Sequence, residues 1–363
     1  MSEYNLLNGY VGSKAPYTSK IKALFDPTCT KYLEPFAGGA ATFFSIYNGK
    51  YEKEGLNDIN PNVILLYKAL EDDETRQETI EEILKIEKPD DEAIAREQFR
   101  KAKKNMLPPT TQIKNIPQKE WGKIARDVYT VYSQSFNCGA KSYSRQKSAE
   151  KYKYETRRNL LNAVERLKTH PQISQLNGIG FIKKVKVQRE TQMLIDWPYV
   201  GLYRNQSKLY LSEMSGLYEH IMGAYALADS QAAVVMCDYR SQYEGVPTVY
   251  DAILGDEWHC YKLADTYKHC EVVELGQHKM KAQEFVWTNR VPPNAGLYLS
   301  MVDYKEKITI EEYWDRIRYA CENRLVPDAH IMEYVSTFSR LYEGKQLLDD
   351  DFVKSVKHNK KTK

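Results

Sequence analysis

The sequence Met193-Leu194-Ile195-Asp196-Trp197-Pro198-Tyr199 places a carboxylate directly after a short apolar run, and an aromatic-Pro-aromatic turn follows it. The apolar run predicts a buried strand, and an open α/β sheet binds its ligands just beyond the carboxyl ends of its strands. Because a proline disfavours the helical region for the residue before it, Trp197 is expected to be extended. The turn therefore directs one carboxylate, several backbone carbonyls and a flat ring at one spot. That arrangement suits a planar nucleobase with an exocyclic amine.

A second strand end is expected upstream, after Lys31–Glu34, where small residues open the turn Ala37–Ala40. Backbone without side chains can approach a ligand closely there, and the start of the next helix offers free N–H groups. Asp58 follows about 20 residues later, the distance at which nucleotide-binding folds place an acid that holds ribose hydroxyls. Asn57, Asp58 and Asn60 also cap helices well, so a purely structural role stays open for this segment.

The amino-terminal stretch 8–25 is typical of a glycine-containing loop that leads into an amphipathic helix. Gly9, Gly12 and Lys14 lack the spacing of a phosphate-binding loop, which argues against a nucleotide triphosphatase. Tyr10 and Lys14, four residues apart, are instead suited to receiving the carboxylate of a ligand.

The composition indicates a globular cytosolic chain, with 42% apolar and 28% charged residues among 363. The first ten residues lack the features of a signal peptide, and no run reaches the roughly 18 apolar residues of a membrane span. The six cysteines form no disulfide framework, so reduced thiols are expected. A net charge of +3 does not by itself indicate a nucleic-acid partner. Residues 141–168, however, hold nine Lys/Arg against three Glu, which suits either a phosphate backbone or a solvated helix face.

Periodicity divides the chain into three parts. An α/β pattern occupies 1–65 and 187–300, and a mostly helical block, 66–186, interrupts it. Helices are expected at 72–104, 121–133, 157–167 and 211–227, and strands at 181–187, 192–195, 232–237, 271–275 and 284–288. The third part, 301–363, is expected to be a helical extension. Its first helix is opened by a capping box at Thr309, its second spans 328–342, and its basic end, KSVKHNKKTK, is expected to be disordered.

Taken in order, these segments resemble the Dam-type (α-group) DNA adenine methyltransferases, which use S-adenosylmethionine. The resemblance runs from Tyr10 to about Asn289. Its segments are Tyr10, Gly12 and Lys14; Glu34 to Phe44; Asn57 to Asn60; Asp196 to Tyr199; Trp287 to Asn289; and the stretch Arg158-Asn159-Leu160. Each segment is weak alone, but together and in the order of the family they are specific. The resemblance implies a Rossmann-like methyltransferase sheet with helices on both faces, and a target-recognition domain inserted at 66–186.

The resemblance also implies the site residues. The cofactor, S-adenosylmethionine without any metal, would be bound by Tyr10, Gly12, Lys14, Glu34, Pro35, Phe36, Ala37, Gly38, Gly39, Asp58 and Asp196. Lys14 would counter the methionine carboxylate, and Asp58 would accept hydrogen bonds from the ribose. Methyl transfer to N6 of a flipped-out adenine would use Asp196, Trp197, Pro198 and Tyr199. The Asp196 side chain and the Trp197 carbonyl would accept the amine hydrogens, and Tyr199 would stack on the base.

Double-stranded DNA is the implied partner, and the block 66–186 would read its sequence. The candidate contacts are Ser135, Asn137, Lys141, Arg145, Lys147, Lys151, Lys153, Arg157 and Arg158. We expect a monomer or weak dimer without membrane attachment, in the cytoplasm of a bacterial, archaeal or phage-infected cell.

Two positions depart from the pattern of the family. Trp197 stands where the first catalytic proline is expected, and its indole would crowd or reshape the base pocket. Ala40 replaces the last glycine of F-x-G-x-G, which is tolerable if that position is helical. A catalytically inactive DNA-binding homologue is therefore an alternative, as is the same fold acting on cytosine N4 or on RNA. A metal protein is a further alternative, because His259-Cys260 and His269-Cys270 recur ten residues apart, although no standard zinc module has this spacing.

Overall fold

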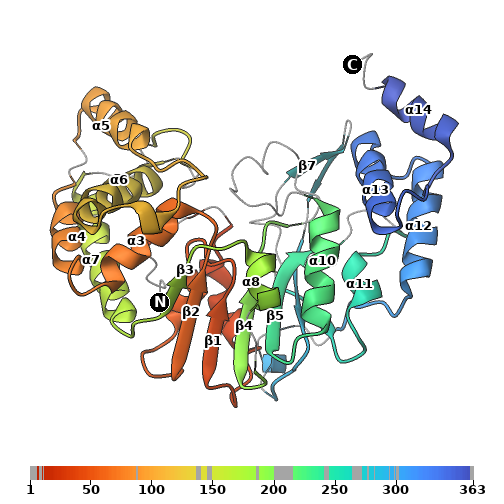
Figure 1. The fold of residues 1–363 in the computed structure, drawn as a ribbon, viewed down its shortest axis with the longest axis horizontal. Coiled ribbons are helices and arrows are strands. Elements are labelled where there is room, and N and C mark those ends of the chain that lie inside the picture. Colours follow the sequence, from red (N-terminus) through yellow and green to blue (C-terminus); the bar gives the residue numbers. More distant parts are fainter. Residues whose placement is uncertain are drawn as a thin grey trace.

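A computed structural model describes most of the chain (Figure 1). The described residues are 6–7, 10, 12–86, 89–135, 140–144, 149–184, 188–199, 216–240, 245–263, 272–275, 278–281, 283–293, 295–297, 299 and 302–359, with the backbone alone for 272–281 and 358–359. In Figure 1 a central sheet separates two groups of helices, α3 to α7 on the left and α12 to α14 on the right.

The central sheet has seven strands in the order β3-β2-β1-β4-β5-β9-β6. Their bounds are Gln172–Ser174, Lys53–Asn57, Lys31–Glu34, Thr191–Ile195, Ala233–Tyr239, Glu284–Thr288 and His259–Lys262. The strands from β3 to β5 are parallel, and β9 runs antiparallel to both of its neighbours. Every residue of β4 and β5 is buried, as expected for central parallel strands covered on both faces. The expected α/β class with a Rossmann-like methyltransferase sheet is confirmed.

Alternate residues of β4 face opposite layers. Met193 and Ile195 belong to one core cluster, here called the second core cluster, together with Trp197 and helix α10 (Leu217–Ala228). Leu194 belongs to the other, first core cluster, with helices α3 (Pro61–Glu71) and α6 (Trp121–Gln134). This alternation follows from the two-residue period of a strand. Short helices complete the two layers at η1 (Ala15–Tyr17), α1 (Thr18–Lys22), α2 (Ala41–Ser45), α8 (Gly178–Lys184), α11 (Val249–Ile253) and η6 (Ala295–Leu297).

The structure corrects the expected strand 181–187, and it places the expected strand 271–275, which is present, outside the main sheet. Residues 181–184 belong to helix α8, because Asn177 caps its first turn by accepting from the Gly180 amide at 2.9 Å; residues 185–187 lie outside the described part. Strand β7 (Val272–Leu275) pairs with β8 (His278–Lys281) in a separate two-stranded sheet. The edge of the main sheet is instead β6, which was not predicted because its polar ends gave no strand pattern.

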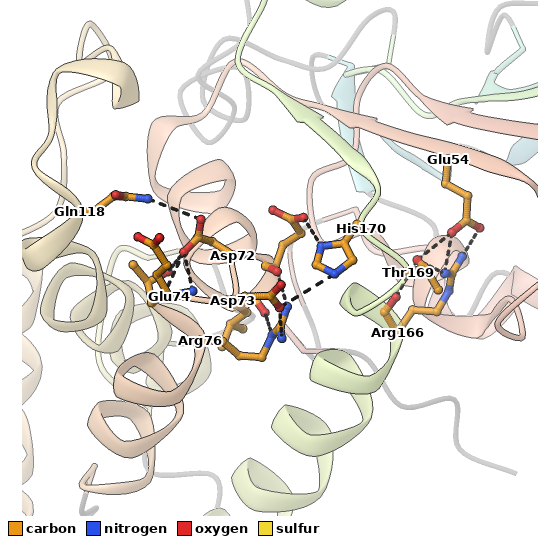
Figure 2. Close-up of polar contacts among 12 residues, drawn as sticks. Glu54, Asp72, Asp73, Glu74, Arg76, Gln118, Arg166, Thr169 and His170 are labelled. Atoms are coloured by element: carbon orange, nitrogen blue, oxygen red, sulfur yellow. Dashed lines mark hydrogen bonds and ion pairs between the residues drawn. The ribbon is translucent and has the colours of Figure 1, made fainter.

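The helical block contains α3, α4 (Arg76–Leu84), α5 (Glu92–Lys104), η2 (Ile113–Asn115), η3 (Gln118–Glu120), α6 and α7 (Ala149–Leu167). Its last helix is attached to the sheet through Arg166 (Figure 2). The guanidinium pairs with Glu54 of β2, donates to the Phe43 carbonyl at 3.1 Å and lies 3.9 Å from the Phe43 ring centroid. Strand β3 follows immediately, so the sheet includes part of the range 66–186 that was assigned to the insert.

The carboxyl-terminal extension packs on the second core cluster. Helix α12 (Ile310–Glu322) begins at Thr309, whose hydroxyl accepts from the Glu312 amide at 3.1 Å, so the expected cap is confirmed. Helix α13 (Asp328–Leu341) follows, and α14 (Asp350–Asn359) ends the described chain. The expected disorder is therefore wrong for 354–359, because Val353 and Val356 are buried and hold α14 in place. Across the described ranges, no helix combines the length and apolar character that a membrane crossing requires.

Candidate functional site

The segment before the first helix meets the turn after β4. The Nζ atom of Lys14 lies 2.9 Å from Oδ1 of Asp196, donates to the Gly12 carbonyl at 2.8 Å and lies 4.8 Å from the centroid of the Tyr199 ring. The side chain of Lys14 is 5% exposed, and that of Asp196 is 23% exposed. A buried ammonium thus faces a partly accessible carboxylate at the carboxyl end of a central strand.

Burial and charge act against each other in this pair. Burial raises the pKa of Asp196, and the Lys14 ammonium lowers it. Burial also disfavours the charge of Lys14, but the acidic groups of Asp196, Glu284 and Cys237 outweigh it and raise the pKa of the lysine. Lys14 therefore keeps its proton. Among the described residues it forms an ion pair with Asp196, although the resemblance assigned Lys14 to the methionine carboxylate.

The indole of Trp197 is directed into the core. It is 1% exposed, its Nε1 donates to Oδ2 of Asp238 at 2.9 Å, and its ring stacks on Tyr250 with a centroid distance of 6.1 Å. A Cβ atom added at Gly223 of α10 would lie only 2.6 Å from the indole. The ring that was expected to crowd the base pocket is therefore part of the second core cluster.

The rest of the turn is also packed against the core, with Tyr199 in the first core cluster and Trp197 in the second. The carbonyl of Pro198 lies 2.6 Å from Nε2 of His220, and the ring of Tyr199 packs edge-on against Tyr239 with a centroid distance of 4.6 Å. Tyr199 is 8% exposed. The side chains on both sides of Pro198 are thus packed against β5 and α10, while the Asp196 side chain faces Lys14.

The glycine turn between β1 and α2 is tied to Asp58, which follows β2. The Gly38 amide donates to Oδ2 of Asp58 at 2.7 Å, and the Asn60 amide donates to Oδ1 at 2.8 Å. The ring of Tyr10 covers the turn, since a Cβ atom at Gly39 would lie 2.8 Å from that of Tyr10. The Tyr10 side chain therefore occupies the space that side chains at positions 38 and 39 would fill.

Ala40 is not helical, contrary to the condition on which its tolerance was predicted. It is the residue before α2 and has a φ of 47°, in the left-handed region where glycine is favoured. Its methyl group is nevertheless buried in the first core cluster.

Among the predicted cofactor residues, Glu34 and Phe36 have structural partners. Glu34 is 4% exposed and accepts from the Tyr32 hydroxyl and from the Phe43 amide, which fixes the first turn of α2. Burial raises the pKa of this carboxyl to about 8. The ring of Phe36 fills the space beside Gly178, where a Cβ atom would lie 2.2 Å away.

The Asn57 side chain links three strand ends, a role that no sequence pattern indicated. Its amide nitrogen donates to the carbonyls of Pro35 at 2.9 Å and Leu176 at 3.0 Å, and its oxygen accepts from the Ser174 hydroxyl and the Leu176 amide. One buried side chain thereby joins the ends of β1, β2 and β3. The Ala37 amide adds a bond of 2.8 Å to the Asn57 carbonyl.

The candidate DNA contacts divide into two groups. Ser135 is buried and accepts from the Ala140 amide at 3.1 Å, so it is part of the loop structure. Lys141 is exposed, and its carbonyl accepts from Lys103 of α5 at 2.7 Å. Exposed or half-buried positions of α7 carry Lys151, Lys153, Arg157 and Arg158. Asn137, Arg145 and Lys147 lie outside the described residues.

The described part of the chain contains no cluster of three His, Cys, Asp or Glu side chains suited to a metal ion. His259 is hydrogen-bonded to Asp303 at 2.7 Å, and Cys260 is buried in the second core cluster. Cys29, Cys237, Cys260 and Cys321 are free thiols. His269 and Cys270, the other pair behind the metal hypothesis, lie outside the described residues, as does Cys138.

Comparison with known proteins gives two matches. Residues 10–192, just over half of the chain, match the model of a family described as D12 class N6 adenine-specific DNA methyltransferase. A stretch of 59 residues is 36% identical to the Type II methyltransferase M.CviBI of Paramecium bursaria Chlorella virus NC1A. That stretch covers 16% of this chain and 22% of the viral protein. The family match includes Tyr10, Lys14, the glycine turn and Asp58, and it ends four residues before Asp196.

Proposed function

We propose, on the premise that this chain belongs to the D12 class N6 adenine-specific DNA methyltransferase family, that it methylates the exocyclic N6 amine of a flipped-out adenine in double-stranded DNA. The methyl donor is S-adenosylmethionine. The observation that carries the proposal is the convergence of the glycine turn, Asp58 and the Asp196 turn. Strands β2, β1 and β4 are parallel neighbours, so these segments leave the sheet at one edge.

The residues at this edge fit the cofactor. Each oxygen of Asp58 accepts one backbone N–H, and an ionised carboxylate has about four acceptor sites, so acceptor capacity remains for ribose hydroxyls. The adjacent turn at Gly38 and Gly39 has no side chains of its own. S-adenosylmethionine supplies an electrophilic methyl group on a sulfonium. Asp58 would hold its ribose, and Phe36 to Gly39 would line its cleft.

The catalytic residues act by accepting hydrogen bonds and by positioning. The Asp196 carboxylate and the Trp197 carbonyl would accept the two hydrogens of the adenine amine and so direct its lone pair at the methyl group. Positive charge that develops on the amine nitrogen is stabilised by acceptors already aimed at it. Burial raises the pKa of Asp196, and the Lys14 ammonium opposes that rise and so favours the ionised carboxylate. Tyr199 would stack on the extruded base, which helps to offset the few kcal/mol that flipping costs.

Helix α7 supports DNA as the substrate. The exposed Tyr154 ring lies 5.6 Å from the Arg158 guanidinium, and Lys153 and Arg157 are exposed beside it. A flat ring among cations suits a phosphate backbone with neighbouring bases. We assign target recognition on this basis to helices α4 to α7, the helical part of the range 66–186.

The experiment is transfer of tritiated methyl from S-adenosylmethionine to duplex oligonucleotides of mixed sequence, followed by nucleoside digestion and mass spectrometry. N6-methyladenine is expected. The Asp196→Ala variant should lose transfer while it still binds the cofactor, and Asp315→Ala, an exposed change on α12, is the matched control. N4-methylcytosine, or transfer only to RNA, would replace adenine in DNA as the substrate. Cofactor or DNA binding without transfer would indicate the inactive homologue.

A further inference from the structure

Two buried ionisable side chains lie under the catalytic turn and contact consecutive residues of it. Asp238 of β5 is 0% exposed and His220 of α10 is 1% exposed. Oδ2 of Asp238 accepts from the Trp197 indole at 2.9 Å, and Nε2 of His220 lies 2.6 Å from the Pro198 carbonyl oxygen. The same Nε2 lies 4.0 Å from Oδ2 of Asp238. The turn is therefore bonded through a side chain at one residue and through the backbone at the next.

Both ring nitrogens of His220 face backbone carbonyl oxygens. Its Nδ1 lies 2.9 Å from the Gly216 carbonyl oxygen, and its Nε2 faces the Pro198 carbonyl oxygen. Carbonyl oxygens only accept, so a ring nitrogen that carries a proton donates to the carbonyl that it faces. The ring therefore links helix α10 to the turn beside the Asp238 carboxyl.

The Asp238 carboxyl group accepts further hydrogen bonds in the core. Besides the indole, its Oδ2 accepts from the Tyr250 hydroxyl, and its Oδ1 accepts from the Tyr239 amide at 2.7 Å. Burial raises the pKa of Asp238 to about 6, and His220 together with these hydrogen bonds opposes that rise. A buried charge is tolerated only when it is paired and hydrogen-bonded, and the Trp197 indole supplies one of the bonds.

The helix above the indole is shaped for it. Gly223 lies inside α10, where glycine costs about 0.5–1 kcal/mol relative to alanine. The close approach of the indole explains that choice, because a Cβ atom there would lie 2.6 Å from the ring. Gly223 thus leaves space for the Trp197 ring, and Asp238 accepts the hydrogen bond that this ring donates.

We propose that His220 and Asp238 are positioning residues for the methyl transfer, and that the Asp238–Trp197 hydrogen bond is what allows tryptophan to replace the first proline of the catalytic turn. This rests on the proposed function. Together the two side chains fix the backbone of Trp197 and Pro198, and with it the Trp197 carbonyl that receives an amine hydrogen. Neither side chain touches substrate or cofactor. They act through the turn.

The effect on the reaction follows from the tolerance of the site. A misplacement of about 1 Å can slow an enzyme about 10²-fold. Loss of the anchor should therefore lower the rate of the methyl-transfer step and leave the affinity for S-adenosylmethionine nearly unchanged, because Asp58 and the glycine turn belong to other strands.

The test compares single-turnover rates and S-adenosylmethionine affinity in the full chain. Asp238→Leu removes the charge and the acceptor, and we expect a rate about 10²-fold lower with unchanged cofactor affinity. Asp238→Asn keeps an acceptor for the indole and should recover at least part of the rate. Trp197→Phe removes the donor and keeps most of the volume. Since Trp197→Phe and Asp238→Leu break the same bond, the double variant Trp197→Phe/Asp238→Leu should be no slower than the slower single variant.

Asp127→Asn is the matched control, because it neutralises a buried carboxylate of α6 away from the turn. Should Asp238→Leu fail to fold, Trp197→Phe decides the matter, because it removes the donor of the same hydrogen bond. The proposal is overturned if the folded Trp197→Phe or Asp238→Leu variant keeps the wild-type rate, or if the loss follows cofactor affinity instead of the transfer step.

A second readout does not depend on activity. Hydrogen exchange should become faster in Asp238→Leu and Trp197→Phe within the peptide 193–199 and stay unchanged across 31–40. If wild-type protein transfers no methyl group, the proposed function fails and the exchange data alone test the anchor. Equal exchange of the peptide 193–199 in wild type and variants would refute it.

Discussion

The Lys14 ammonium lies 2.9 Å from the Asp196 carboxylate, so the loop that precedes the first helix supplies the counter-charge of the residue that ends a central strand. Asp196 is otherwise in a setting that favours its protonated form, because burial raises its pKa. An ionised carboxylate is a stronger acceptor for amine hydrogens than a protonated carboxyl group. The activity of the site therefore depends on a cation that comes from a distant part of the sequence.

Replacing Lys14 with Met is expected to move the acidic limb of the pH–rate profile upward. A neighbouring opposite charge lowers a carboxyl pKa by about 1–3 units, so its removal should shift the limb by a similar amount. Lys14→Arg keeps the charge and should retain the position of the limb. Methyl-transfer rates between pH 5 and pH 9 measure the effect. An unmoved limb in Lys14→Met would show that another group keeps Asp196 ionised.

Asp58→Asn is expected to weaken binding of S-adenosylmethionine. A hydrogen bond to a charged group contributes about 1.5–3 kcal/mol, which corresponds to a loss of roughly 10- to 150-fold in affinity. Isothermal titration calorimetry measures the cofactor affinity. DNA affinity serves as the internal control, because Asp58 follows strand β2 and does not lie on α7. Unchanged cofactor affinity would remove Asp58 from the ribose site.

Glu34→Gln is expected to alter the dependence of stability on pH. Burial raises the pKa of Glu34 from its ordinary 4.5 to about 8, so the folded chain keeps a proton that the unfolded chain loses. The bound proton contributes fully to the free energy of unfolding at pH values below the pKa of Glu34 in the unfolded chain. This contribution declines as the pH rises toward the pKa in the folded chain. Glutamine keeps the acceptor for Tyr32 and Phe43 without titrating. The Tm of Glu34→Gln minus the Tm of the wild type should therefore increase between pH 4.5 and about pH 8 and stay constant above that range. A difference in Tm that does not change with pH would contradict a protonated Glu34.

Arg166→Leu is expected to destabilise the attachment of α7 to the sheet. The side chains of Arg166 and Glu54 are 4% and 6% exposed, and breaking a buried ion pair costs about 3–5 kcal/mol because it leaves the partner unpaired (Figure 2). The double change Arg166→Leu/Glu54→Leu removes both charges and should recover a large part of the loss. Chemical denaturation measures the free energies of unfolding. A double variant less stable than either single variant would contradict this account.

Lys153→Ala and Arg157→Ala are expected to weaken DNA binding at every sequence alike. Each phosphate contact that is lost should reduce the slope of log K against log salt by about 0.9. Binding measured at several salt concentrations gives the slope, with Lys354→Ala on α14 as a control for simple loss of charge. Equal slopes in wild type and variants would place the DNA elsewhere.

Local patterns were sufficient for the elements nearest to the site. The apolar run before Asp196 and the small residues after Glu34 have few alternatives, because a buried parallel strand and a tight turn demand those residue types. The cap at Thr309 was equally readable. Residues 181–184 were not, since a side-chain cap from Asn177 overrides their strand-like composition.

Contacts between residues far apart in the sequence determine the features of the site that local patterns did not predict. The direction of the Trp197 indole depends on Gly223 and Asp238, which only the fold brings beneath the turn. The left-handed backbone of Ala40 likewise depends on a buried methyl group, and the ion pair of Lys14 on a loop folding back over the sheet. None of these relationships has a periodicity or a spacing that a reader of the chain could recognise.

The missing methyl group at Gly223 constrains how this turn can change by single substitutions. Proline in place of Trp197 would leave a void beneath α10 and an acceptor without its donor, and alanine in place of Gly223 would collide with the indole. A change from the tryptophan-containing turn to a proline-containing turn therefore requires simultaneous replacements at Trp197 and at Gly223 of α10. Relatives that have proline at this place should carry a bulkier residue at the helix position and a different partner for the strand carboxylate.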